Sequence, residues 1–240
     1  MRDNEYVITE NKCIAENIFL MKLKGDTSEI DNTGLFINLK VTGCYLRRPM
    51  SIAGYTHEEI TIVYKVVGKG TEILSGMKPG EKIDALCPLG NGYDLEEIPD
   101  DALLIGGGAG AVPIYFLAKE LIRKGKSPTV IAGFNSEKDI IFKEEFRALD
   151  TEVKFVTVDG SVGIKGFVTE GMNGGEYVCA CGPEPMLKAV AERAERGQYD
   201  LSARMACGFG ACMGCTIITK NGPKRVCKEG PVFFSEEIIW

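Results

Sequence analysis

The sequence predicts an antiparallel β-barrel followed by an α/β domain on a parallel sheet, with a cysteine-rich segment at the end of the chain. Three observations predict this fold class. Residues 1–98 contain short alternating runs of strand-forming residues, residues 99–203 alternate between strand and helix patterns, and residues 204–240 contain four cysteines. A chain of 240 residues is long enough to give each domain a hydrophobic core.

The barrel prediction depends on several strand patterns of similar length. They alternate apolar and polar residues, are rich in β-branched side chains, and are separated by glycine, asparagine or aspartate. The clearest are Tyr6–Thr9, Ile18–Leu23, Leu35–Leu39 and Glu59–Val67. Short strands at this spacing are typical of a small barrel or sandwich. Pro99–Asp101 marks the expected boundary of this domain.

Beyond that boundary, strand and helix patterns follow one another. The expected strands are Ala102–Ile105, Thr129–Ala132, Val153–Thr157 and Tyr177–Ala180. The expected helices are Val112–Lys124, Lys143–Ala148 and Glu184–Arg196. Alternation of this kind predicts βαβ units on a parallel sheet. From Arg204 onward the rhythm stops and the cysteine-rich segment begins.

Composition and charge argue against several classes of protein. A net charge of -6 disfavours nucleic acid as the main partner, because phosphate binding favours a basic face. No apolar run reaches the roughly 20 residues of a membrane span, and the charged N-terminus lacks the apolar stretch of a signal peptide. Nine cysteines in such a chain indicate metal or redox chemistry more than a disulfide framework. We therefore expect a cytoplasmic protein.

The strongest motif is the cysteine spacing at the end of the chain. Cys207, Cys212 and Cys215 form a C-x4-C-x2-C pattern, and Cys227 follows. This arrangement is typical of plant-type [2Fe-2S] ligation. Glycines between the ligands let the backbone wrap closely and turn its amides toward sulfur. Two alternatives stay open: a structural zinc site, which more often pairs two C-x-x-C knuckles, and unligated thiols.

A glycine run lies between an expected strand and an expected helix. It reads Gly106-Gly107-Gly108-Ala109-Gly110, with Pro113 close behind. Glycines at such a turn allow a pyrophosphate to approach the backbone, and the helix N-terminus offers free N–H groups and a positive dipole end. The run does not match G-x-G-x-x-G fully, so a tight turn without a ligand is the alternative.

Two further motifs are weaker when taken alone. Cys181 and Gly182 follow an expected strand, and ligands of open α/β sheets gather at the carboxyl ends of strands. Cys181 is therefore a candidate to lie beside a nicotinamide, and an inert buried cysteine is the alternative. Arg48-Pro49-Met50-Ser51 offers a guanidinium fork and a hydroxyl to a phosphate, with a plain surface loop as the alternative.

Together and in this order, the motifs resemble the ferredoxin–NADP reductase superfamily. Within it, the chain is most similar to the electron-transfer subunits of class 1B dihydroorotate dehydrogenases. The matching stretches run nearly from end to end. They are Leu46–Ile52, Tyr64–Thr71, Pro88–Leu95, Gly106–Gly110, Asp159–Ser161, Cys181–Met186, Cys207–Cys215 and Val226–Phe233.

The resemblance implies a role for each segment and motif. Residues 1–98 would form an FAD-binding barrel, residues 99–203 an NAD-binding domain, and residues 204–240 a [2Fe-2S]-binding segment. The FAD contacts would be Arg48, Pro49, Met50, Ser51, Val63, Tyr64, Lys65, Gly70 and Thr71. The NAD contacts would be Gly106, Gly107, Gly108, Gly110, Cys181 and Gly182, with Cys181 near the nicotinamide and no catalytic acid or base assigned. The cluster ligands would be Cys207, Cys212, Cys215 and Cys227.

The resemblance also implies a function. Electrons would pass from an FMN-containing dihydroorotate dehydrogenase catalytic subunit, through the cluster and FAD, to NAD⁺ in de novo pyrimidine (UMP) biosynthesis. The expected complex is a heterotetramer with two copies of each subunit, and this chain alone is not expected to act on dihydroorotate. Phe134–Ser136 contain no arginine for a 2′-phosphate, which favours NAD over NADP.

Two other functions stay open. One is a subunit of another ferredoxin-linked or bifurcating NAD(P)H oxidoreductase on the same scaffold. The other, from a different class, is a non-catalytic zinc-binding module.

Overall fold

The computed structural model describes residues 2–240, which divide into two compact units. The first unit contains the chain up to Gly92 together with residues 203–217 and 223–231. The second contains residues 93–202, 218–222 and 232–240. Within residues 2–240, no helix combines the length and the apolar character that crossing a bilayer requires.

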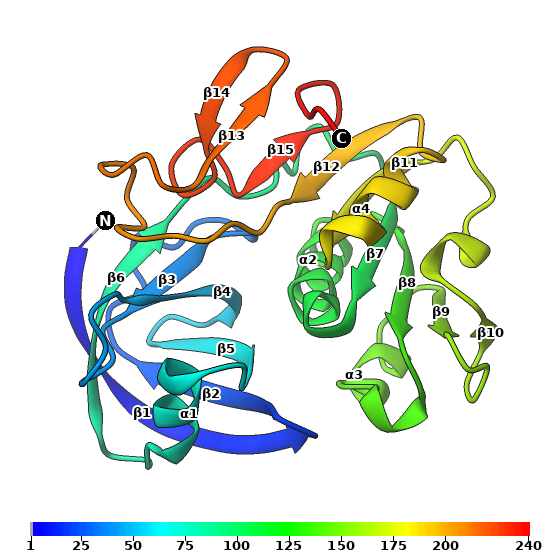
Figure 1. Ribbon diagram of the computed structural model, residues 1–240. Helices are drawn as coiled ribbons and strands as arrows, with labels where there is room; N and C mark the ends of the chain where they lie inside the picture. The colour runs from blue at the N-terminus through cyan, green and yellow to red at the C-terminus, as the bar shows by residue number, and fades with distance from the viewer. Residues whose placement is uncertain (1) are drawn as a thin grey trace. The chain divides into compact units, whose positions relative to one another are not determined.

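Six strands of the first unit close into an antiparallel barrel in the order β1-β2-β5-β4-β3-β6 (Figure 1). They are β1 (Arg2–Ala15), β2 (Ile18–Lys24), β3 (Phe36–Leu39), β4 (Arg48–Tyr55), β5 (Glu59–Lys65) and β6 (Lys82–Leu89), and helix α1 (Lys69–Gly76) precedes β6. Every second side chain of β5 and β6 is buried, so Ile60 and Ile62 join Ile83 in one core. Closure leaves no strand of the barrel with a free edge.

The predicted barrel is confirmed, although the sequence patterns identify only some of its strands. They locate β1, β2, β3 and β5 but miss β4 and β6. Both missed strands contain proline, Pro49 in β4 and Pro88 in β6. Proline donates no ladder hydrogen bond, so its presence argues against a strand when the sequence is considered alone.

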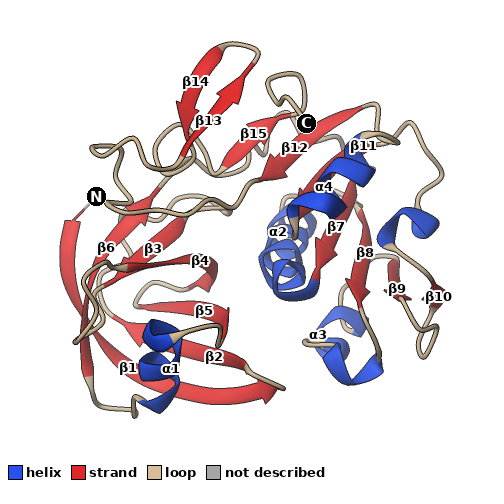
Figure 2. Ribbon diagram, viewed as in Figure 1, coloured by secondary structure: helices blue, strands red, loops and turns tan. Residues whose placement is uncertain are grey.

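The second unit is built on a seven-stranded sheet in the order β10-β9-β8-β7-β11-β12-β15. Its strands are β7 (Leu103–Gly107), β8 (Thr129–Phe134), β9 (Val153–Thr157), β10 (Ile164–Lys165), β11 (Tyr177–Cys181), β12 (Arg196–Asp200) and β15 (Val232–Phe234). All neighbours are parallel except β12 and β15. The helices are α2 (Ala111–Arg123), α3 (Lys143–Arg147) and α4 (Glu184–Ala191), with 3₁₀ turns η1 (Gly108–Gly110), η2 (Glu137–Asp139) and η3 (Val168–Gly171). Figure 2 shows this alternation of strands and helices, which confirms the predicted α/β domain.

One predicted helix is too long. The pattern predicts helix over Glu184–Arg196, but α4 ends at Ala191 and Arg196 begins β12. Strand β12 reads Arg-Gly-Gln-Tyr-Asp, without the apolar run of an ordinary central strand. Its buried Gln198 is satisfied by the backbone of Asp94, accepting from its N–H at 2.7 Å and donating to its carbonyl at 2.9 Å. Tertiary contacts thus allow a polar strand that no local pattern indicates.

The cysteine-rich segment is shared between the two units. Strands β13 (Thr216–Thr219) and β14 (Gly222–Arg225) pair with each other, and β15 joins the seven-stranded sheet beside β12. The functional division into residues 1–98, 99–203 and 204–240 therefore does not follow the boundaries of the compact units, and it stays a prediction.

Candidate functional site

The predicted FAD contacts of the barrel lie on β4, on β5 and in the first turn of α1. Arg48 begins β4, and its guanidinium passes directly over Gly70 of the helix. A Cβ on Gly70 would overlap Arg48 Nε, so only glycine admits the guanidinium at this point. The guanidinium also donates to the carbonyl of Leu46. These contacts bring Arg48 to the start of α1.

The start of α1 supplies hydrogen-bond donors beside that guanidinium. Thr71 Oγ1 accepts from the N–H of Val67 at 2.9 Å and donates to the carbonyl of Gly68 at 2.9 Å, which closes the turn before the helix. The first N–H groups of a helix have no acceptor within the helix and lie at its positive end. Arg48 and this turn therefore form a corner that suits a pyrophosphate.

The other predicted FAD contacts lie in different surroundings. Tyr64 is buried, stacks on Phe19 with ring centroids 5.8 Å apart, and donates its hydroxyl to Asn11 Oδ1 at 3.1 Å. Burial raises the pKa of this phenol. Met50 packs against the same barrel core. Met50, Pro49 and Val63 are half-buried, whereas Ser51 and Lys65 are exposed.

The second unit brings the predicted NAD contacts together at one edge of its sheet. Gly106 and Gly107 end β7, Gly108 and Gly110 form η1 before α2, and Cys181 ends the neighbouring β11 in register with Gly106. Gly182 follows directly. This edge carries the carboxyl ends of parallel strands, where ligands of such sheets bind.

Glycine is required at this edge for two different structural reasons. A Cβ on Gly106 would overlap the backbone of Ala111, and a Cβ on Gly110 would overlap the carbonyl of Cys181. These two glycines satisfy close packing of strand and helix. Gly108 differs, since its φ is +54 and nothing lies within 4 Å of its Cβ position. The alternative of a tight turn thus accounts for Gly106 and Gly110, whereas Gly108 leaves open space at the start of α2.

A buried carboxyl lies against Cys181. Cys181 and Asp200 are 8% and 5% exposed, they pair across β11 and β12, and the Cys181 thiol donates to Asp200 Oδ2 at 3.4 Å. Burial raises the pKa of Asp200 to about 7, against the smaller opposite effect of the thiol. Burial and then Asp200 raise the pKa of Cys181 well above its usual range. Cys181 is therefore an uncharged thiol at neutral pH.

Sequence reasoning missed Asp200. It belongs to β12, the strand for which the sequence has no apolar pattern. A single aspartate in a polar stretch carries no signal of burial. Only the register between β11 and β12 places it beside Cys181.

The four tail cysteines come together as two pairs. The N–H of Cys212 donates to Cys207 Sγ at 3.5 Å, and the N–H of Cys227 donates to Cys215 Sγ at 3.4 Å. A further N–H, from Gly214, donates to Cys212 Sγ at 3.4 Å. Within residues 2–240, no group of three or more His, Cys, Asp and Glu side chains gathers closely enough to hold a single metal ion. The arrangement is two thiol pairs, each in contact with backbone N–H groups.

The first pair is prepared to carry negative charge. Burial alone would raise the pKa of Cys207, but the N–H groups of Phe209 and Cys212 lead the contacts that lower it to about 6. The loop can aim these donors at sulfur because Gly208 and Gly210 have φ values of +78 and +90. In the second pair, burial and then Cys215 raise the pKa of the Cys227 thiol to about 12. A metal ion would reverse this, since a coordinating thiol is deprotonated outright.

Side chains of the same unit brace the segments that carry these cysteines. Arg225 Nη1 donates to the carbonyl of Gly210 at 2.6 Å, and its Nε donates to Glu229 Oε2 at 3.0 Å. Asn91 Nδ2 donates to the carbonyls of Lys228 and Glu229 at 3.1 and 3.2 Å. Four cysteines in two pairs, supplied with N–H donors and held by such contacts, fit a [2Fe-2S] cluster, which takes four thiolate ligands.

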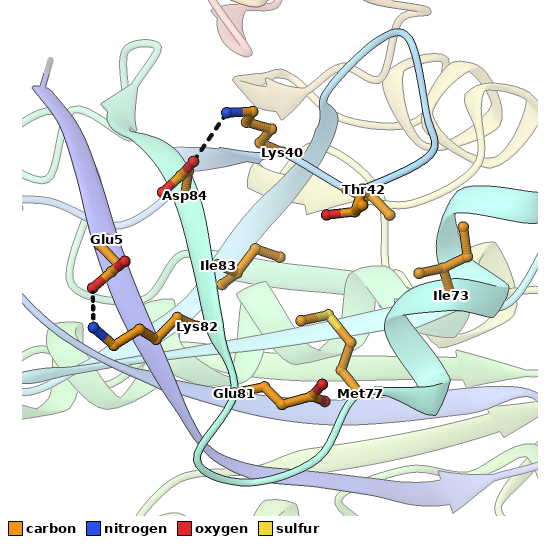
Figure 3. A pocket seen from close by; sticks show the side chains of 10 residues that line it. Glu5, Lys40, Thr42, Ile73, Met77, Glu81, Lys82, Ile83 and Asp84 are labelled. Atoms are coloured by element: carbon orange, nitrogen blue, oxygen red, sulfur yellow. Dashed lines mark hydrogen bonds and ion pairs between the residues drawn. The ribbon is translucent and has the colours of Figure 1, made fainter.

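A cavity of about 360 Å³ in the first unit contains none of the predicted site residues. Figure 3 shows its apolar side chains, Ile73, Met77 and Ile83, beside two ion pairs. Lys82 pairs with Glu5 at 2.6 Å, and Lys40 pairs with Asp84 at 3.1 Å. The remaining charged residue, Glu81, accepts from the backbone N–H of Lys78, so each charged group of the cavity already has a partner, and we assign the cavity no role.

Comparison with protein families matches two parts of the chain. A family described as the iron-sulfur cluster binding domain of dihydroorotate dehydrogenase B matches residues 202–239. A family described as an oxidoreductase NAD-binding domain matches residues 104–192. The two matches contain the cysteine tail and the glycine edge, respectively.

Whole-chain relatives extend these matches. The electron transfer subunit of dihydroorotate dehydrogenase B (NAD(+)) from Bacillus pumilus is 41% identical over 99% of this chain and 98% of its own. The corresponding subunit from Fusobacterium nucleatum is 37% identical over 99% of both chains. Among solved structures, an NADH-dependent reduced ferredoxin-NADP oxidoreductase gives a TM-score of 0.87 at 29% identity, covering 98% of this chain and 90% of that chain. A cytochrome P450 reductase from Amycolatopsis, at 21% identity, shares the fold with a TM-score of 0.71 and covers 80% of this chain and 65% of that chain. From the identity to curated relatives along nearly its whole length, this chain belongs to the family of dihydroorotate dehydrogenase B electron transfer subunits.

Proposed function

We propose that this chain passes electrons from a dihydroorotate dehydrogenase catalytic subunit to NAD⁺ in pyrimidine biosynthesis, through a [2Fe-2S] cluster and FAD. The observation that carries the proposal is the arrangement of the four tail cysteines, in which Cys207 contacts Cys212 and Cys215 contacts Cys227. The relatives of this chain at 37–41% identity are electron transfer subunits. When bound, FAD exchanges two electrons with a nicotinamide and single electrons with an iron–sulfur cluster.

The residues of the barrel would bind and orient FAD. Arg48 and the first turn of α1 would hold its pyrophosphate, with Gly70 leaving room for the guanidinium and Thr71 keeping the turn closed. Pro49, Met50, Ser51, Val63, Tyr64 and Lys65 would line the remainder of the flavin site. Tyr64 would act through its ring and backbone, and its hydroxyl, which donates its proton to Asn11 Oδ1, would be available only as a hydrogen-bond acceptor.

The carboxyl edge of the sheet would bind NAD. Gly108 and the start of α2 would receive its phosphates, and Cys181 would lie beside the nicotinamide as a neutral thiol. A neutral sulfur places no charge next to a ring whose charge changes on reduction. Asp200 would hold the proton of this thiol in place.

Cys207, Cys212, Cys215 and Cys227 would ligate the cluster, and the backbone N–H groups that already donate to Cys207 and Cys215 would stabilise the negative charge on these sulfurs. The partner would be an FMN-containing catalytic subunit, in a heterotetramer with two copies of each chain. We also propose a cytoplasmic location and the functional division into residues 1–98, 99–203 and 204–240.

The test is anaerobic and follows the visible spectrum. The tagged chain is purified from its native host with its associated proteins, and dihydroorotate is added. We expect the flavin and cluster bands to bleach and added NAD⁺ to be reduced. The chain alone should ignore dihydroorotate yet oxidise NADH with an artificial acceptor.

Two outcomes point elsewhere. If NADH bleaches both cofactors but dihydroorotate does nothing in the complex, the chain serves another NAD(P)H oxidoreductase. A colourless chain that contains zinc would contradict electron transfer altogether. As a matched control, Cys212→Ser should lose the cluster bands while Cys13→Ser, at an exposed cysteine of β1, keeps them.

A further inference from the structure

A buried asparagine of the barrel contacts the loop that carries the first cluster cysteine. Asn38 lies on β3 and is 1% exposed. Its Nδ2 donates to the carbonyl of Cys207 at 3.0 Å, across 169 positions of sequence. Both residues belong to the same compact unit. The contact therefore fastens the Cys207 loop to a barrel strand.

The loop is shaped to accept this asparagine. Gly208, the next residue, has a φ of +78, and a Cβ there would overlap Asn38 Nδ2. Gly208 thus satisfies two requirements, a left-handed backbone and close approach of the carboxamide. The other end of the carboxamide, Oδ1, is buried without a hydrogen-bond partner within residues 2–240. Burying an unpaired polar atom costs stability, so a buried asparagine here is not explained by packing of the barrel.

The position of Asn38 connects two predicted sites. Asn38 pairs with Pro49 across β3 and β4, and β4 carries the predicted flavin contacts Arg48, Pro49, Met50 and Ser51. Strand β4 and Cys207 are thus joined through one residue, by ladder pairing on one side and by the carboxamide on the other.

We propose that Asn38 is a positioning residue that holds the Cys207 side of the cluster at a set place relative to the flavin-binding strand. This inference rests on the proposed function, since it requires a cluster at Cys207 and a flavin at β4. Its consequence is that loss of the carboxamide changes the environment of the cluster and loosens its hold, without changing how NADH reduces the flavin.

The experiment uses the full chain reconstituted anaerobically with FAD, iron and sulfide. Asn38→Leu keeps most of the volume and removes the donor, whereas Asn38→Ala also makes room beside Gly208. We expect both variants to show an altered EPR spectrum of the reduced cluster. We also expect them to lose the cluster to a chelator about tenfold faster, equivalent to ~1.4 kcal/mol, a usual size for one such bond. FAD content and the rate of flavin bleaching by NADH should stay as in the wild type.

A second set of variants tests the contact from the loop. Gly208→Ala should release the cluster faster than Gly222→Ala, which has a similar φ of +94 but nothing within 4 Å of its Cβ position. Asn38→Ala removes the atoms that the new Cβ of Gly208→Ala would meet. The rate of cluster release in the double variant should therefore rise by less than the combined effects of the two single substitutions predict.

The outcomes separate the two claims. If the wild-type chain takes up no cluster, the proposed function fails. If the cluster forms and both Asn38 variants keep the wild-type EPR spectrum and release rate, the role of Asn38 is overturned while the proposed function stands. Additive effects of Gly208→Ala and Asn38→Ala would also overturn it.

Discussion

Cys181 on β11 and Cys207 in the tail loop give the same side chain opposite chemistry. Cys181 lies on a central strand whose backbone pairs with β7 and β12, and burial raises the pKa of its thiol. Cys207 lies in a glycine-rich loop whose N–H groups are free to approach sulfur, and they lower its pKa to about 6. In a sheet, the ladder consumes the donors, whereas a loop in left-handed conformations can aim them at a side chain. The difference shows that the pKa of a thiol here depends on two opposing factors, burial, which raises it, and backbone N–H donors within reach of sulfur, which lower it.

The largest expected effect is on thiol alkylation of the cluster-free chain. At pH 7.5, Cys207 should be mostly thiolate and Cys181 almost wholly protonated. Because the thiolate is the nucleophile, iodoacetamide should modify Cys207 at least ~100-fold faster than Cys181. Peptide mass spectrometry after timed quenching measures both rates. Equal alkylation rates for Cys207 and Cys181 in the folded protein would contradict the proposed difference between the two thiols.

A glycine pair tests whether close packing or conformational freedom governs the strand edge. Gly110→Ala places a Cβ on the carbonyl of Cys181, so we expect a loss of about 2–3 kcal/mol in the free energy of unfolding. In Gly108→Ala the new Cβ meets open space, so the only cost is the left-handed backbone at a φ of +54. We expect this variant to lose about 1 kcal/mol in the free energy of unfolding. Denaturant titration of both variants gives the order, and a larger loss at Gly108 would contradict the assignment.

The buried carboxyl beside Cys181 predicts a pH dependence. The pKa of Asp200 is about 7 in the folded chain and 3.8 ordinarily, so the folded state holds a proton that the unfolded state releases between these values. Stability should therefore fall as pH rises from about 4 to 7 and level off above that.

Asp200→Asn removes this titration. It should raise the free energy of unfolding by about 2 kcal/mol at pH 8 and by little at pH 4. Unfolding curves at both pH values measure the difference, with the exposed Asp101→Asn as control. A gain that is the same at both pH values would rule out the buried proton.

The smallest expected effect concerns the brace of the tail. Arg225 lowers the pKa of Glu229 to about 2 through a side-chain hydrogen bond, but both side chains are partly exposed. Glu229→Gln should therefore cost less than about 1 kcal/mol. The Arg225–Glu229 pair stabilises the folded chain fully at pH values above 4.5, the ordinary pKa of glutamate, and this stabilisation is lost as the pH falls toward 2. Alkylation of Cys207 should be unchanged, which separates the brace from the N–H donors.

The sequence by itself determined the cysteine spacing of the tail, the glycine run of the sheet edge and the order of barrel and parallel sheet along the chain. The spacing of Cys207, Cys212 and Cys215, the run from Gly106 to Gly110, and the alternation in β5 are local patterns. Residues a few positions apart are held together by the chain itself, so their relation can be predicted without the fold.

Tertiary structure decided the partners of those residues. Asp200 reaches Cys181 through the register of β11 and β12, and Asn38 reaches Cys207 across 169 positions. The polar strand β12 and the proline-containing β4 have no local signal, because pairing with their neighbours stabilises them. Contacts between distant residues depend on strand register and burial, and these exist only once the whole chain has folded.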